Sequence, residues 1–167
     1  MDNVILGFYG DAVRRADYRD ARLRALLEEA RDAVGPRAPA SGLVVEGDAE
    51  ASGDPAVVMV SNNPYAIDRK LARETRPRLD TGALGVVVLD RPGVRRRPYR
   101  TWTAPSLQVG APGPVHAGRD GEAVTLTPPL RFAIRPRALR VRIAARHPGA
   151  SPAAQLGALP RAGRSRI

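Results

Sequence analysis

The feature of this 167-residue chain that most constrains its fold is a succession of short β-type segments separated by turn residues. The segments are rich in Val, Ile, Leu or Thr, and Gly, Pro and Asp stand between them. Repeated short strands with this punctuation are typical of antiparallel sandwiches and barrels. The predicted strands are Asn3–Tyr9, Leu43–Glu46, Ala56–Val60, Leu84–Asp90, Thr101–Val109, Pro114–Ala117, Ala123–Leu126, Arg131–Ile134 and Leu139–Ala144. We therefore expect a mainly β fold, an antiparallel β-sandwich.

One amphipathic helix is expected near the N-terminus. Asp17 or Asp20 offers an N-cap, and Gly35-Pro36 ends the pattern. Between them, apolar residues recur at the spacing of one helical face, at Leu23, Leu26, Leu27, Ala30 and Val34. The chain is long enough for one hydrophobic core, so residues 3–146 are predicted to form a single domain. Because residues 147–167 lack periodicity, we predict that they form a disordered basic tail.

The composition excludes several classes of protein. The absence of cysteine excludes disulfides and thiolate metal sites. No apolar run approaches the roughly 18 residues needed to span a bilayer. Met1 is followed by an acid and a short mixed strand rather than by a signal peptide. We therefore expect a cytoplasmic protein.

The net charge of +10 is carried almost wholly by arginine, and Lys70 is the only lysine. Richness in Arg, Ala, Gly and Pro is typical of a GC-rich genome, which accounts for part of this charge. Two clusters remain: nine arginines without any acid from Leu130 to the end, and a second group at Arg91, Arg95, Arg96, Arg97 and Arg100. Such surfaces attract phosphates. No recognition helix or RNA-binding aromatic motif accompanies them, which disfavours nucleic acid as the partner.

The main candidate site is the run Val115–Glu122, which sets Asp120 and Glu122 on either side of Gly121, just before a strand. Acids on a tight, accessible turn can take a proton or face a metal. Asp-Gly is also the commonest dipeptide of hairpin turns, so a solvated turn is the alternative. Pairing with the neighbouring Arg119 would weaken Asp120 as a base.

Four further positions have both a functional and a structural interpretation. Asn62 and Asn63 precede Pro64, and they either line a cleft or form a structural turn. Asp80 lies in a Gly-containing turn and is either a metal ligand or part of an Asx turn. His116 either titrates or packs as an ordinary hydrogen-bonded histidine.

Four blocks, Val60–Tyr65, Pro77–Leu89, Val115–Glu122 and Leu126–Val141, resemble in order and separation the C-terminal domain of the bacterial diacylglycerol kinase-like lipid kinases. The resemblance runs from about residue 3 to residue 141. It implies that the chain is the acceptor-binding domain of an ATP-dependent phosphotransferase that uses magnesium. The expected partners are a lipid alcohol such as diacylglycerol and, peripherally, an anionic membrane.

The resemblance also assigns roles to the candidate residues. Asp120 would be the general base that takes the proton from the lipid alcohol. Glu122 would support it or help to hold the nucleotide's magnesium, and Asp80 would bind a structural magnesium. The substrate and nucleotide cleft would be lined by Asn62, Asn63, His116 and Gly121.

The family's nucleotide-binding domain, with its Gly-Gly-Asp-Gly-Thr loop, is not among these residues. We expect that domain to be supplied in cis or in trans, and negligible activity from this chain alone. The surface that would pack against that domain is expected to be an apolar patch and to favour homodimerisation. The alternative is a non-catalytic remnant or module that binds anionic lipid surfaces or a protein partner through its arginines. The replacement of the family's usual aliphatic residue by Arg119, and of a turn glycine by Arg137, suits that alternative.

Overall fold

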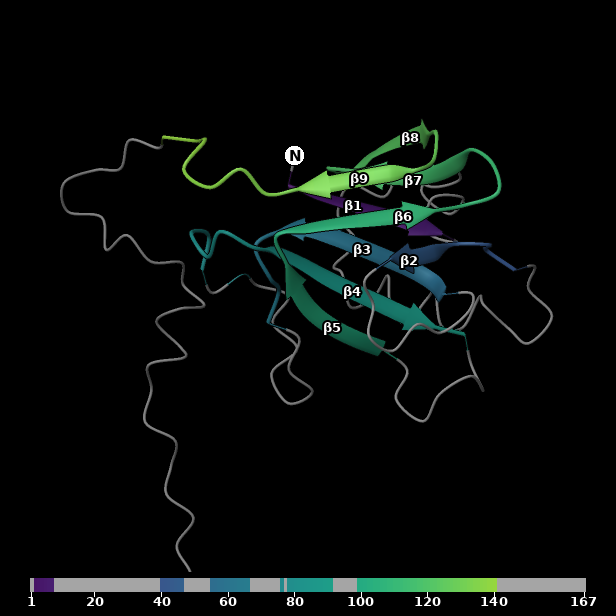
Figure 1. Ribbon diagram of the computed structural model, residues 1–167, viewed down its shortest axis with the longest axis horizontal. Helices are drawn as coiled ribbons and strands as arrows, with labels where there is room; N and C mark the ends of the chain where they lie inside the picture. Colours follow the sequence, from purple (N-terminus) through teal and green to yellow (C-terminus); the bar gives the residue numbers. More distant parts are fainter. Residues whose placement is uncertain are drawn as a thin grey trace, which may run out of the picture.

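The computed structural model describes residues 2–7, 40–46, 55–66, 76, 78–91 and 99–140. These residues form nine strands and, within the described ranges, no helix. The strands make a six-stranded sheet in the order β5-β4-β3-β1-β7-β8 and a three-stranded sheet in the order β2-β6-β9 (Figure 1). Their bounds are β1 (Asn3–Gly7), β2 (Val44–Glu46), β3 (Pro55–Asn62), β4 (Leu84–Asp90), β5 (Tyr99–Ala104), β6 (Ser106–Gly110), β7 (Val115–Arg119), β8 (Glu122–Leu126) and β9 (Leu130–Ala133).

All strand pairs within the two sheets are antiparallel, which confirms the prediction of a mainly β, antiparallel fold. The predicted amphipathic helix and the predicted basic tail lie outside the described residues, as do Arg95, Arg96 and Arg97. The strand predicted at residues 139–144 is not formed at Leu139 or Arg140, and its remainder is likewise outside the described ranges.

The central strands of the large sheet are buried on both faces. Every residue of β4 is buried, and in β3 only Asn62 is not. Continuous apolar runs such as these are typical of strands covered on both sides. The N-terminal strand β1 is inserted between β3 and β7, with Ile5 opposite Met59 on one side and Gly118 on the other. Strands far apart in the sequence therefore meet side by side.

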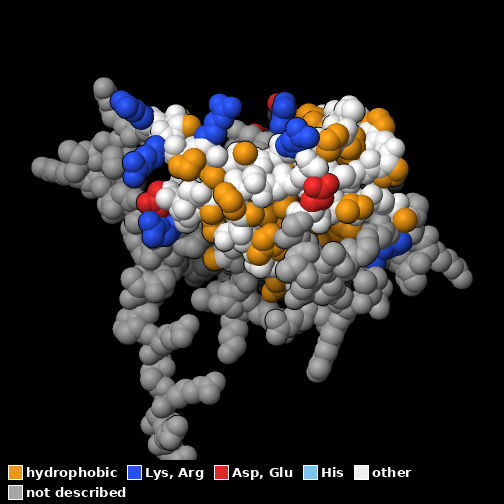
Figure 2. All heavy atoms as spheres, viewed as in Figure 1, with side chains coloured by type: hydrophobic (Ala, Val, Ile, Leu, Met, Phe, Trp, Pro, Cys, Tyr) orange, Lys and Arg blue, Asp and Glu red, His pale blue; other side chains and the backbone are white. Residues whose placement is uncertain are grey.

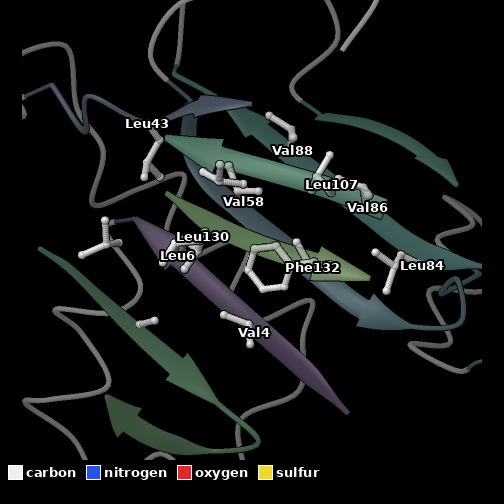
Figure 3. Packing of buried hydrophobic residues seen from close by; sticks show 14 residues of the cluster. Val4, Leu6, Leu43, Val58, Leu84, Val86, Val88, Leu107, Leu130 and Phe132 are labelled. Atoms are coloured by element: carbon white, nitrogen blue, oxygen red, sulfur yellow. The ribbon is translucent and has the colours of Figure 1, made fainter. Parts of the chain in front are cut away.

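The hydrophobic core takes side chains from both sheets (Figure 3). Val58, Val86 and Val88 of the large sheet belong to the same buried cluster as Leu107 and Phe132 of the small one. In β6 and β9 buried and more exposed residues alternate, so that one face of the small sheet packs on the core and the other meets solvent. Each fully buried aliphatic or aromatic side chain contributes about 1.5–3 kcal/mol.

One predicted strand, Thr101–Val109, is two strands in the structure. The break falls at Pro105, where β5 ends and β6 begins. Proline has no N–H to donate to a ladder, so a sheet cannot continue through it undisturbed. The Pro105 carbonyl instead accepts a hydrogen bond from the Ile134 N–H at 3.0 Å. At this point the chain passes from the large sheet to the small one.

Candidate functional site

Asp120 lies in the two-residue turn that joins β7 to β8. Asp120 and Gly121 both have left-handed backbone angles, with φ of 52° and 88°, as a type I′ hairpin turn requires. Arg119 and Glu122 pair across the ends of the two strands. Asp-Gly suits this turn because both residues tolerate positive φ. The structure therefore has a tight hairpin here, and the hairpin carries the predicted acid at its exposed tip.

The Asp120 side chain is oriented by the start of β1. Its Oδ1 accepts hydrogen bonds from the backbone N–H groups of Asp2 at 2.7 Å and Asn3 at 2.8 Å. The Asp120 N–H in turn donates to the Asn3 carbonyl at 3.2 Å. Within the described part of the chain, no hydrogen bond reaches Oδ2, and no ion pair joins Arg119 to Asp120. One carboxylate oxygen is thus held by the fold, while the other is available.

A polar network connects this turn to the end of β3. Arg76 forms a bidentate ion pair with the Asp2 carboxylate. Nη1 donates to Oδ1, and Nη2 donates to Oδ2 at 2.8 Å. Nη1 also donates to the Asn62 carbonyl at 3.1 Å, and the guanidinium stacks 5.3 Å from the Tyr65 ring centroid. Asn62 N–H donates to the Asp2 carbonyl at 2.8 Å. Asp2 therefore touches Asp120, Asn62 and Arg76 at once.

Burial and charge act in opposite directions on Arg76. Partial burial disfavours the charged guanidinium, but the hydrogen bonds to Asp2 and the charges of Tyr65, Asp2 and Asp120 outweigh it, so the pKa of Arg76 is raised. Sequence reasoning missed Asp2 and Arg76 as site residues. Their ion pair spans 74 positions and belongs to no motif, so no local signal in the sequence could have found it.

Asn63 is buried and holds the loop in front of β4. Its Oδ1 accepts hydrogen bonds from the Thr81 N–H at 2.9 Å and the Thr81 hydroxyl at 2.7 Å. Its Nδ2 donates to the Leu79 carbonyl, and its N–H to the Ala83 carbonyl. With φ of 69°, Asn63 uses the backbone freedom expected before Pro64. The structural-turn interpretation therefore describes Asn63, whereas Asn62 is half-buried and accepts a hydrogen bond from Asn63 Nδ2.

Asp80, the predicted metal ligand, lies exposed in the loop that Asn63 holds. Both of its carboxylate oxygens face Arg78, with Nε–Oδ1 at 3.0 Å and Nη2–Oδ2 at 3.2 Å. The hydrogen bonds and charge of Arg78 lower the pKa of Asp80. The described residues contain no group of three or more His, Asp or Glu side chains that could share a metal ion. This arrangement does not fit a magnesium site, because Asp80 offers a single carboxylate already engaged by a cation.

The remaining predicted residues are not part of the network around Asp120. Glu122 is exposed at the start of β8, and its side chain makes no hydrogen bond with a described residue. His116 lies in β7, and its Nδ1 is 3.1 Å from Thr125 Oγ1 on the neighbouring strand. Arg100, a member of the second arginine cluster, pairs with the buried Asp90 and lies 6.0 Å from the Trp102 ring. Among the described residues, no helix is long and apolar enough to cross a membrane.

Comparison with known proteins bears on the fold. No protein-family model matches the sequence, and no curated protein matches it. One similar solved structure is described as "A putative diacylglycerol kinase from Bacillus anthracis str. Sterne", with a TM-score of 0.51 and 16% identity. A second, described as a diacylglycerol kinase from the same strain, has a TM-score of 0.51 and 14% identity. Each alignment covers 81% of this chain and 50% of the other. The chain therefore has a diacylglycerol kinase-like fold and spans about half the length of those two proteins.

Proposed function

We propose that this chain is the acceptor-binding, base-bearing domain of a lipid kinase-like phosphotransferase, with a lipid alcohol such as diacylglycerol as acceptor. The fold likeness and the four sequence blocks support this proposal. The observation that carries it is the exposed residue Asp120, whose Oδ1 is held by β1 while Oδ2 accepts no hydrogen bond from a described residue. Under this proposal, the half of the kinase that this chain matches is its C-terminal half. The two sheets of the chain, which share a core, would then form a sandwich.

In the proposed reaction, Asp120 Oδ2 takes the proton of the lipid hydroxyl. The acceptor oxygen forms a bond to the γ-phosphorus of ATP, the bond from that phosphorus to the bridging oxygen breaks, and ADP leaves. A general base contributes about 10²–10⁴ in rate, whereas holding two substrates in line is worth effective molarities of about 10⁵–10⁸ M. A nucleotide-binding domain, in cis or in trans, is therefore the larger requirement. No step is assigned to magnesium at Asp80, because Arg78 engages that carboxylate.

The test is ATP-dependent phosphorylation of diacylglycerol in mixed micelles with magnesium, by this chain alone and with a nucleotide-binding domain of a lipid kinase added in trans. We expect activity only in the mixture, and a loss of about 100-fold or more in Asp120→Asn. Asparagine is the informative replacement because its Oδ1 can still accept the two β1 hydrogen bonds.

Glu46→Gln is the matched control, since it removes an exposed carboxylate in β2, outside the network around Asp120. We expect it to cost much less than Asp120→Asn. Wild-type activity in Asp120→Asn would overturn the role of the base. No activity in any mixture, from folded protein, would overturn the proposed function and favour the non-catalytic lipid-binding alternative.

A further inference from the structure

Exposed arginines and leucines gather at one end of the molecule. They come from the loop before β4 and from the segment after β9. A Cβ added to Gly82 would lie 3.9 Å from Pro136 Cγ, so the loop and the segment adjoin. Both lie beyond the strand ends on the same side of the molecule (Figure 1). We call this surface the basic rim, and its residues are Arg78, Leu79, Arg135, Arg137, Leu139 and Arg140.

The basic rim also carries large hydrophobic side chains that are exposed, which is uncommon among the described residues. The large hydrophobic side chains exposed among the described residues are Val44, Leu79 and Leu139, at 61%, 63% and 79%. Two of these three belong to the rim, and each stands next to an arginine in the sequence. Leu79 is held outward by a fixed backbone, because its carbonyl accepts the Asn63 Nδ2 hydrogen bond at 3.1 Å. Its exposure is therefore a property of an anchored loop.

The charge of the rim is strongly positive. Within the described residues 78–83, Asp80 is the one acid and is paired with Arg78, while no acid follows Glu122 anywhere in the sequence. Arginine side chains, coloured blue, follow this edge of the molecule in Figure 2. Guanidinium groups bind phosphate oxygens well, and neighbouring leucines can enter the headgroup region of a bilayer. A surface that combines both is complementary to anionic lipid.

We propose that the basic rim docks on an anionic lipid bilayer. The loop before β4 follows the end of β3, and Asp120 contacts the start of β1 at that same end of the large sheet. A bilayer on the rim would therefore lie at the end of the sheet that carries the Asp120 turn. This inference goes beyond the proposed phosphoryl transfer, since binding to vesicles is measured without ATP and without catalysis.

The test is sedimentation of the full chain with vesicles of equal parts phosphatidylcholine and phosphatidylserine, beside vesicles of phosphatidylcholine alone. We expect binding to the anionic vesicles only, weakening as salt is added. Each basic residue near such a surface is worth about fivefold in affinity, so the double variant Arg135→Gln/Arg140→Gln should bind about 25-fold more weakly. Leu79→Ser/Leu139→Ser should also weaken binding, with less dependence on salt.

Two controls are matched to these variants. Arg131→Gln removes one exposed arginine outside the rim and is compared with Arg135→Gln alone, and Val44→Ser removes the exposed large hydrophobic side chain outside it. Both controls should bind the anionic vesicles as the wild type does. Equal loss in the control and rim variants, or no wild-type binding, would overturn the proposal. So would wild-type vesicle affinity in the rim variants together with loss of self-association, which would identify a second copy as the occupant.

Discussion

The Asp120 turn and the Asp80 loop look alike in the sequence but are built in opposite ways. Each places an aspartate close to a glycine at an exposed turn, and both turns lie at the same end of the large sheet. Asp120 directs Oδ1 to the backbone of β1, so that the acid itself joins two strands. Asp80 directs both oxygens to Arg78 at the surface, while the buried Asn63 joins its loop to β3.

The difference shows that an acid's place in a motif does not tell whether the fold depends on it. At Asp120, the proposed chemical role and the observed structural role fall on one carboxylate, with Oδ1 bound to the backbone of β1 and Oδ2 proposed as the base. In the Asp80 loop it is Asn63 that holds the backbone, whereas Asp80 makes only an ion pair at the surface. Substitutions in the two turns should therefore have unequal effects on stability.

The largest effect is expected for Asn63→Ala. This change removes the partners of the Thr81 N–H, the Thr81 hydroxyl and the Leu79 carbonyl, and it leaves alanine at a positive φ. Unsatisfied groups and backbone strain together should lower the free energy of unfolding by about 3 kcal/mol. Denaturant unfolding of the full chain measures this. Asn62→Ala is the neighbouring control and should cost clearly less, whereas equal losses would show that Asn63 does not anchor the loop.

Asp120→Ala should have an intermediate effect. The Asp2 and Asn3 N–H groups lose their acceptor at the start of β1, and alanine suits the φ of 52° poorly. We expect a loss of about 1–2 kcal/mol in the same unfolding measurement. Asp120→Asn should keep most of the stability, because its amide oxygen can replace Oδ1. If alanine and asparagine proved equally stable, the contact between Asp120 and β1 would have no energetic importance.

The smallest effect is expected for Asp80→Asn, since exposed ion pairs contribute little to stability. The pair with Arg78 lowers the pKa of Asp80 from its ordinary 3.8. Any stabilisation is therefore present above about pH 4 and is lost as the pH falls through the lowered value. Thermal unfolding of the variant and the wild type should coincide at neutral pH. A clear loss that disappears in acid would show that the Asp80 loop depends on its acid after all.

Strand prediction from this sequence was most accurate where apolar residues run without interruption. The bounds of β4 agree with the prediction at both ends, because a run of Val and Leu between turn residues has few alternatives. The segment Thr101–Val109 shows the limit of that approach, since its alternation continues past Pro105 while the chain changes sheets. Periodicity describes which face a residue occupies and does not identify the sheet to which it belongs.

The candidate site was predictable only in part. Asp120 was identified from a local motif, and the hairpin turn that carries it is visible in the same few residues. Asp2 and Arg76 were not, because their contacts exist only after β1 has inserted between β3 and β7. The helix and the basic tail predicted at the two ends of the chain remain predictions.

By itself, the sequence determined the antiparallel β character of this protein, the Asp-Gly hairpin and the excess of arginine. These depend on residue type and short-range order, which act within a few positions of the chain. Only the tertiary structure decided which oxygen of Asp120 is held, that Asn63 anchors the Asp80 loop, and that this loop adjoins the arginine-rich segment after β9. Those outcomes depend on hydrogen bonds and packing between distant strands, and such contacts form only when the sheets assemble around their shared core.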